Sequence, residues 1–131
     1  MNPPSNFIIV DDDKLVCMFC SMVLKKFFNN ATVKTFEDPQ TGLEFIKLGQ
    51  FLQDAEARTV LFLDINMPSM NGWEFLENFE NLDEEIKNSI QIYILSSSVD
   101  ERDKERAANN KYVKAFWVKP LTKEMLQSAH T

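Results

Sequence analysis

Short apolar runs recur along the chain, separated by longer stretches in which apolar residues return every three or four positions. The runs are short and apolar, and several are rich in Val, Ile and Phe. This pattern is typical of strands that are buried on both faces of a parallel sheet. The predicted strands are Asn6–Val10, Thr32–Phe36, Val60–Leu63, Gln91–Leu95 and Ala115–Val118.

Helical patterns occupy the intervals between these strands. In the first interval, an apolar stripe repeats every four residues and predicts an amphipathic helix. Its members are Leu15, Phe19, Val23 and Phe27, with Val16 and Cys20 beside them. A second helix is predicted to begin at Asp38-Pro39, a capping side chain followed by a first-turn proline, and to continue through Leu43–Leu52. Three further helices are predicted over Gly72–Asn81, Asp100–Asn109 and Thr122–Ala129.

Five strands that alternate with five helices predict a doubly wound α/β domain with a five-stranded parallel sheet. A chain of 131 residues fits one such domain, whose core is expected over about residues 6–129. In sheets of this kind, functional groups gather outside the carboxyl ends of the strands. The residues that directly follow each strand are therefore the first candidates for a functional site.

Polar side chains with complementary chemistry follow four of the predicted strands. Carboxylates follow the first and third strands, hydroxyls follow the fourth and a lysine follows the fifth: Asp11, Asp12, Asp13, Asp64, Ser96, Ser97, Ser98 and Lys119. Two like charges 4 Å apart repel by about 4 kcal/mol at an effective dielectric of 20, so a divalent cation would make such a cluster tolerable. All-oxygen ligands suit Mg²⁺, with Mn²⁺ as the alternative ion. A lysine and a hydroxyl beside the ion suit a phosphoryl group, and a carboxylate can act as its acceptor.

Four motifs, each placed after a predicted strand, carry a family resemblance. They are Val10-Asp11-Asp12, the run from Asp64-Ile65-Asn66-Met67-Pro68 to Gly72, Leu95-Ser96-Ser97 and Val118-Lys119-Pro120. In this order they resemble the receiver domain of two-component response regulators, of the chemotaxis-regulator-like type that consists of a single domain. The resemblance implies a flavodoxin-like sheet with the strand order 2-1-3-4-5 and five helices.

The resemblance also implies roles for the acidic residues. Asp64 matches the phosphoacceptor, which takes a phosphoryl group from a histidine kinase or a histidine phosphotransfer protein. Asp11 and Asp12 match the acidic pair that holds Mg²⁺ together with Asp64, and Asn66 would add its backbone carbonyl. Asp13 is interpreted differently, as the residue that begins the first helix.

Further positions match the part of a receiver that responds to phosphorylation. Ser96 matches the hydroxyl that meets the phosphoryl oxygen, and Lys119 matches the lysine that pairs with it, joined to Pro120 by a bond that is commonly cis. Phe116 matches the aromatic switch position; because it is Phe where Tyr is common, it would work by packing alone.

The remaining implications concern the lifetime of the phosphorylated state and the surface that contacts a downstream protein. Side chains at Asn66 and Ser98, two positions beyond Asp64 and Ser96, would tune dephosphorylation. The fourth helix, fifth strand and fifth helix would form the output surface for a protein target that the sequence does not identify. Such a protein catalyses only its own phosphorylation and dephosphorylation, and it is expected to be a monomer or weak dimer.

The interval from Asp12 to Asp64 looks longer than usual for the family, with the excess expected within residues 48–59.

Charge and composition limit the classes of binding partner that the protein is expected to have. Twenty acidic residues against 14 basic ones give a net charge of −6, which disfavours binding to nucleic acid or to an anionic membrane surface. Neither a signal peptide nor an apolar segment of membrane-spanning length is present in the sequence. The protein is therefore expected to be soluble and cytoplasmic.

Several features admit a second interpretation. The Cys17-x-x-Cys20 spacing occurs in redox pairs, but its place inside an apolar helical pattern favours core packing. Trp73 is expected to pack near the site, and Trp117 to face the side of the sheet opposite Phe116. A phosphatase of the haloacid dehalogenase type would also use an aspartyl nucleophile, Mg²⁺ and a lysine, but it requires a second carboxylate at Asn66. A receiver-like interaction module that works without phosphorylation is the other alternative.

Overall fold

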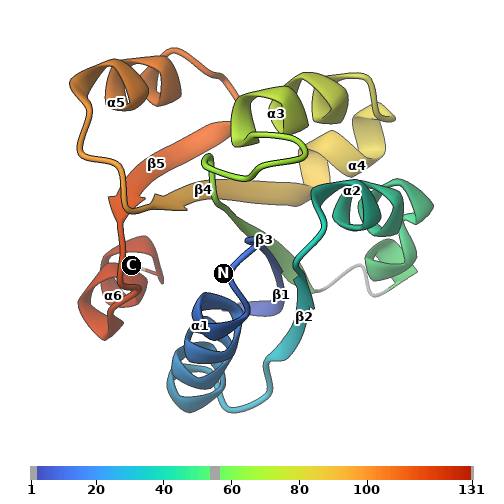
Figure 1. Cartoon of the computed structure of the whole chain (residues 1–131). Coiled ribbons are helices and arrows are strands. Elements are labelled where there is room, and N and C mark those ends of the chain that lie inside the picture. Colours follow the sequence, from blue (N-terminus) through green and yellow to red (C-terminus); the bar gives the residue numbers. More distant parts are fainter. Residues whose placement is uncertain (1–2, 54–56, 131) are drawn as a thin grey trace.

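The computed structural model describes residues 3–53 and 57–130 and shows one parallel sheet between two helical layers (Figure 1). The five strands are ordered β2-β1-β3-β4-β5, which confirms the doubly wound, flavodoxin-like arrangement predicted from the sequence. All four neighbouring pairs are parallel. The strands are β1 (Pro4–Val10), β2 (Thr32–Phe36), β3 (Arg58–Leu63), β4 (Ile90–Ser96) and β5 (Val113–Val118).

Each face of the sheet has its own apolar core because neighbouring residues on a strand point to opposite faces. On β1, Ile8 and Val10 belong to one core, and Phe7 and Ile9 belong to the other. The first core is covered by α2 (Pro39–Leu48), α3 (Gly72–Glu80), α4 (Glu84–Ser89) and α5 (Glu101–Ala108). The second is covered by α1 (Lys14–Phe27) and α6 (Lys123–His130), which lie together on the other side of the sheet (Figure 1).

The same alternation holds at the edge strand β5. Phe116 packs against the first core, and Trp117 packs against the second, where its ring stacks on Tyr93 with a centroid distance of 4.5 Å. The prediction that these two aromatic residues face opposite sides of the sheet is confirmed.

The described residues form six α-helices rather than the five predicted. The additional helix is α4, which lies between α3 and β4 and buries only Ile86. A short helix with one buried side chain leaves no repeating apolar pattern in the sequence. The predicted fourth and fifth helices correspond to α5 and α6.

The buried stripe of α1 differs from the predicted one. The residues buried in this helix are Cys17, Cys20 and Leu24, whereas Leu15 is 73% exposed and Phe19 is 41% exposed. An α-helix has 3.6 residues per turn, so a strict four-residue repeat drifts off the face that meets the sheet. The predicted stripe was therefore wrong in its first half.

Both cysteines of the Cys17-x-x-Cys20 motif are free and buried, as expected for core packing. Burial raises the pKa of Cys17 to about 11 and that of Cys20 to about 12, and the negative charge of Asp11 adds to both shifts. Because the thiolate is the reactive form, this environment does not support a redox pair.

Helix α2 ends earlier than predicted. It stops at Leu48 because Gly49 adopts the left-handed conformation, with φ of 67°, that ends many helices. A 3₁₀-helix, η1 (Gln50–Gln53), follows, so the first part of the expected excess is a separate turn and does not extend α2. Residues 54–56 of that segment lie outside the described residues. Among the helices that the structure describes, none has the length and apolar character needed to cross a membrane.

Candidate functional site

Asp11 and Asp64 leave neighbouring strands at the same edge of the sheet. The Asp64 amide donates to the Val10 carbonyl at 3.0 Å, and the Asp11 amide donates to the Phe36 carbonyl at 3.1 Å. The parallel pairing of β3 with β1 and of β1 with β2 therefore continues to these residues. Both side chains are almost fully buried, with 2% of Asp11 and 4% of Asp64 exposed.

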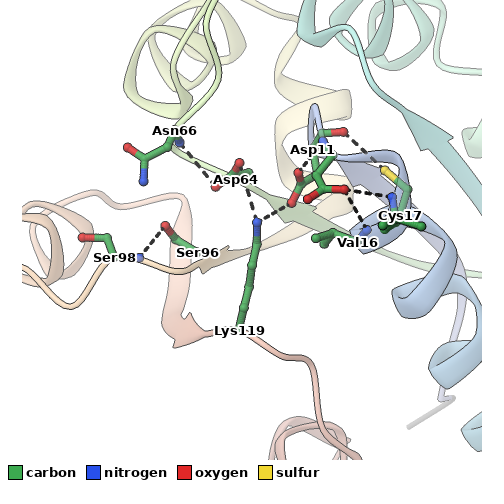
Figure 2. Close-up of polar contacts among 10 residues, drawn as sticks. Asp11, Val16, Cys17, Asp64, Asn66, Ser96, Ser98 and Lys119 are labelled. Carbon is green, nitrogen blue, oxygen red and sulfur yellow. Dashed lines mark hydrogen bonds and ion pairs between the residues drawn. The ribbon is translucent and has the colours of Figure 1, made fainter.

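Lys119 completes this group from the loop after β5 (Figure 2). Its backbone amide donates to the Ser96 carbonyl at 2.8 Å, which fixes the start of the loop beside β4. Its Nζ lies 2.7 Å from Asp11 Oδ2 and 3.7 Å from Asp64 Oδ2. The Lys119–Pro120 peptide bond is cis, as the family resemblance implied.

A third carboxylate joins these two. Oxygen atoms of Asp11, Asp12 and Asp64 lie within 4.8 Å of one another, and Asp12 is exposed to solvent. Two buried carboxylates and one exposed carboxylate form an all-oxygen donor set with an open side. This set fits Mg²⁺, which takes one or two carboxylates and keeps several of its waters.

Asn66 contributes its backbone to the site. The Asn66 amide donates to Asp64 Oδ1 at 3.3 Å, so the turn after β3 stays close to the Asp64 carboxylate, while the Asn66 side chain is exposed. The predicted ligand from this residue is its backbone carbonyl, which belongs to the same turn.

The electrostatics of the site are dominated by the buried Asp64. The pKa of Asp64 is raised to about 6, chiefly by burial. Repulsion from Asp11 also raises this pKa, and its effect is larger than the opposite effect of the positive charge of Lys119. Burial alone would lower the pKa of Lys119, but its hydrogen bond to Asp11 and the charges of Asp64 and Asp11 outweigh this effect and raise it. A protonated lysine thus faces a carboxylate that is held ionised at neutral pH against an unfavourable environment.

We expect Asp64→Asn to stabilise the metal-free protein at pH 7.5. The Asp64 pKa is about 6 in the folded protein and near the 3.8 of an ordinary aspartate in the unfolded chain, so the native state binds more protons between these values. Wild-type stability therefore falls as pH rises from about 4 to about 6, and the deficit is complete above that window. The neutral amide lacks this deficit, and its advantage should be on the order of 1–2 kcal/mol after allowing for partial solvation. Urea denaturation in chelator at several pH values measures it; an advantage that does not shrink toward pH 4 contradicts the assignment.

Asp13 differs from its two acidic neighbours, as predicted. Its Oδ1 accepts hydrogen bonds from the amides of Leu15 at 2.9 Å and Val16 at 3.4 Å, so it caps the N-terminus of α1. Its own amide donates to Asp11 Oδ1 at 2.9 Å. The side chain of Asp13 stabilises the helix, and its backbone orients Asp11.

The structure places Ser96 at the end of β4, fully buried, and Phe116 on the neighbouring strand. Ser96 pairs with Val118 in the β4–β5 register, and Phe116 lies two residues earlier on the same face. Ser98 lies farther along the loop, and its hydroxyl is on the side of Ser96 remote from Asp64 (Figure 2). Ser96 and Phe116 are thus close neighbours in the sheet, whereas the Ser98 hydroxyl does not face Asp64.

Gly72 has no separate role in the sequence-based prediction, but in the structure it permits the close turn after β3. Its amide donates to the Ile65 carbonyl at 3.1 Å. A Cβ at this position would lie 2.7 Å from the Asp64 carbonyl oxygen and 2.7 Å from Ile65 Cα. Only a residue without a side chain lets the start of α3 approach Asp64 so closely. Trp73 follows and is buried beside this turn, as expected.

We expect Gly72→Ala to destabilise the protein by about 1–3 kcal/mol, because the clash is with backbone atoms that cannot move aside. The displaced turn would also weaken Mg²⁺ binding. Gly49→Ala is the matched control: it introduces strain at a positive φ far from the carboxylates. Thermal denaturation and Mg²⁺ titration of both variants check this. Equal losses of Mg²⁺ affinity in the two variants would show that Gly72 has no specific role at the site.

Comparisons with known proteins agree with this geometry. The model of the response regulator receiver domain family matches residues 7–131. A response regulator receiver protein from Dyadobacter fermentans DSM 18053 is 31% identical, with a TM-score of 0.83 over 95% of this chain and 94% of that chain. A two-component response regulator from Cytophaga hutchinsonii is 25% identical, with a TM-score of 0.83 over 97% of this chain and 94% of that chain.

Two further relatives show how far the similarity extends. The chemotaxis response regulator CheY4 of Vibrio cholerae shares the fold, with a TM-score of 0.70 and 22% identity over 96% of this chain and 95% of that one. Stress response regulator protein 1 of Scheffersomyces stipitis is 35% identical over 72 residues, which are 54% of this chain and 22% of that protein. The match thus covers about a fifth of that relative. On the match over residues 7–131, the chain belongs to the response regulator receiver domain family of two-component signalling.

Proposed function

We propose that the protein accepts a phosphoryl group from a phosphohistidine onto Asp64 in a Mg²⁺-dependent reaction and uses it as a signalling switch. The observation that carries this proposal is the convergence of two buried carboxylates with Lys119, whose Nζ is 2.7 Å from Asp11 and 3.7 Å from Asp64. The donor would be a histidine kinase or a histidine phosphotransfer protein.

Asp11, Asp12 and Asp64, with the backbone carbonyl of Asn66, would hold the Mg²⁺, and Mn²⁺ is the alternative ion. When bound, the ion supplies positive charge for the phosphoryl oxygens. A carboxylate oxygen of Asp64 forms the new P–O bond as the P–N bond breaks, and the bonding electrons and a proton remain with the imidazole of the donor. Lys119 keeps a positive charge beside Asp64 throughout, so it can pair with the phosphoryl group.

Ser96 and Phe116 are the proposed switch. The buried Ser96 hydroxyl would turn to the phosphoryl group, and Phe116, which has no phenolic hydroxyl, would respond by repacking against the core. In this structure the proposed output surface is formed by α5, β5 and α6. Its partner is a protein, and the receiver itself acts as a monomer or a weak dimer.

The lifetime of the phosphorylated state is assigned to side chains near the acceptor. The exposed Asn66 side chain lies two residues after Asp64 in the turn, so it can reach a water molecule that approaches the phosphoaspartate. Ser98 is the second tuning residue, although its hydroxyl first has to leave its present partners. The protein would catalyse only its own phosphorylation and hydrolysis.

The test is the binding of beryllofluoride, a phosphoryl mimic, in the presence of Mg²⁺. Trp73 is buried beside the Asp64 turn, so we expect a saturable change in its fluorescence that requires Mg²⁺ and disappears in Asp64→Asn. The signal should be lost in Trp73→Phe and kept in Trp117→Phe. The proposal is refuted if the wild-type protein shows no saturable fluorescence response and calorimetry detects no binding of beryllofluoride. That result would favour an interaction module that works without phosphorylation.

A phosphatase is the competing function with the most similar chemistry. It would require a general acid two residues after the nucleophile, where this chain has Asn66. Steady, multiple turnover of p-nitrophenyl phosphate would favour the phosphatase over the receiver.

A further inference from the structure

A chain of hydrogen bonds runs from the buried end of β4 to the first turn of α5. The Ser98 amide donates to Ser96 Oγ at 3.1 Å. The Ser98 hydroxyl then donates to Asp103 Oδ2 at 2.7 Å and accepts from the Asp100 amide at 3.2 Å. One residue, Ser98, thus connects the proposed switch hydroxyl with the N-terminus of a helix on the proposed output surface.

We propose that Asp103 is a positioning residue that holds Ser98, and through it Ser96, in the resting arrangement of the switch. This inference rests on the proposed function of the Asp64 site and assigns part of its regulation to a residue on α5. Asp103 touches neither the acidic cluster nor Lys119; its hydrogen bond is to Ser98. It would therefore set the balance between two states without taking part in phosphoryl transfer.

Helix α5 buries little apolar surface of its own. Ala107 is its only buried residue. The Arg106 guanidinium lies over the Trp73 ring at 4.8 Å, which connects the last turn of α5 to the start of α3. The Asp103–Ser98 bond is the corresponding connection at the first turn. A helix with so little buried apolar surface can be repositioned by changes in a few polar contacts.

The bond pattern gives the direction of the effect. The Ser98 amide binds Ser96 Oγ on the side remote from Asp64 (Figure 2), so we expect the Ser96 hydroxyl to leave this amide when it turns to donate to a phosphoryl group on Asp64. The loop from Ser96 to Asp100 then loses the bond that fixes it at one end, and its movement would strain the two bonds of the Ser98 hydroxyl to Asp100 and Asp103 at the start of α5. The Asp103–Ser98 bond therefore favours the resting state, and its loss should favour the switched state.

The experiment compares beryllofluoride affinity, measured by calorimetry with saturating Mg²⁺, in the wild type and in variants of Asp103. We expect Asp103→Ala to bind about threefold to tenfold more tightly, which corresponds to the loss of one resting-state hydrogen bond of typical net strength. Asp103→Asn keeps an oxygen that can accept from Ser98 and should stay close to the wild type. Glu101→Ala, which removes an exposed acidic residue from the same helical turn, is the matched control and should also stay close.

A double-mutant cycle with Ser98→Ala separates this role from simple helix capping. If Asp103 acts through Ser98, the affinity gain of Asp103→Ala should vanish in the Ser98→Ala background. A purely structural bond would lower the urea midpoint of each variant and leave beryllofluoride affinity unchanged, which would overturn the inference. Additive gains, or an equal gain in Asp103→Asn and Glu101→Ala, would also overturn it, because they would indicate an effect of charge alone.

The proposed function and this inference fail in different ways. If the wild type does not bind beryllofluoride with Mg²⁺, the proposed function fails. If the wild type binds it and all Asp103 variants bind it equally, the receiver function stands and the positioning role of Asp103 is refuted.

Discussion

Asp64→Asn should abolish the uptake of a phosphoryl group from acetyl phosphate while leaving the fold intact. The amide has nearly the shape of the carboxylate, so it should fill the same site, where only 4% of Asp64 is exposed. Its nitrogen and oxygen are far weaker nucleophiles than an ionised carboxylate oxygen, so no acyl phosphate can form at a measurable rate. Intact-protein mass spectrometry with Mg²⁺ and excess acetyl phosphate should show the added phosphoryl group in the wild type alone.

Asp83→Asn is the matched control for this prediction. It makes the same chemical change at the N-terminus of α4, where the Asp83 side chain makes no capping hydrogen bond. This variant should take up a phosphoryl group as the wild type does. Uptake by Asp64→Asn at the wild-type level would place the acceptor elsewhere, and the proposed function would lose its central residue.

The ionised Asp64 is expected to lower the stability of the wild-type protein and to make the site reactive. The same burial that raises the pKa of Asp64 to about 6 keeps its carboxylate poorly solvated. The ionised form is therefore stabilised by binding a cation, or by forming a bond to a phosphoryl group that pairs with Lys119. Asp64→Asn is therefore expected to be more stable and inactive. Such opposite effects on stability and function are characteristic of a functional site and do not arise from a core-packing residue.

Much of the fold could be predicted because its determinants are local in the sequence. Apolar runs such as Phe7–Val10 and Val60–Leu63 are buried on both faces, so they are apolar throughout, and the carboxyl ends of parallel strands must share one edge. The strand pattern therefore predicts that Asp11, Asp64 and Lys119 lie together at that edge. The distances from Lys119 Nζ to Asp11 Oδ2, 2.7 Å, and to Asp64 Oδ2, 3.7 Å, confirm that the three side chains converge.

The features that the sequence did not predict depend on contacts or on helix phase. Helix α4 buries one side chain, and α1 turns Leu15 outward while its cysteines face the core. The bond between Ser98 and Asp103 joins two side chains five positions apart, and many Ser and Asp pairs at that spacing make no contact. Gly72 was part of a motif, but its closeness to Asp64 is visible only in three dimensions.

The three consecutive carboxylates after β1 should respond very differently to substitution. Asp12→Ala should weaken Mg²⁺ binding by at least about tenfold and abolish phosphorylation at millimolar Mg²⁺. Asp12 is the exposed member of the cluster whose oxygens lie within 4.8 Å of one another, so its loss removes a ligand and leaves the two buried carboxylates in place. Calorimetric Mg²⁺ titration measures the affinity, and acetyl phosphate uptake measures the consequence.

Asp13→Ala is the neighbouring control, because it removes an equal charge one residue away. Its side chain caps α1 through the Leu15 and Val16 amides, so the variant should lose about 0.5–2 kcal/mol of stability. The backbone bond from the Asp13 amide to Asp11 does not involve its side chain, so Mg²⁺ affinity should remain close to that of the wild type. If Asp13→Ala lost Mg²⁺ affinity as Asp12→Ala does, net charge rather than ligation would explain both losses. Weak Mg²⁺ binding in Asp12→Ala alone would then establish that the cluster acts through a specific ligand.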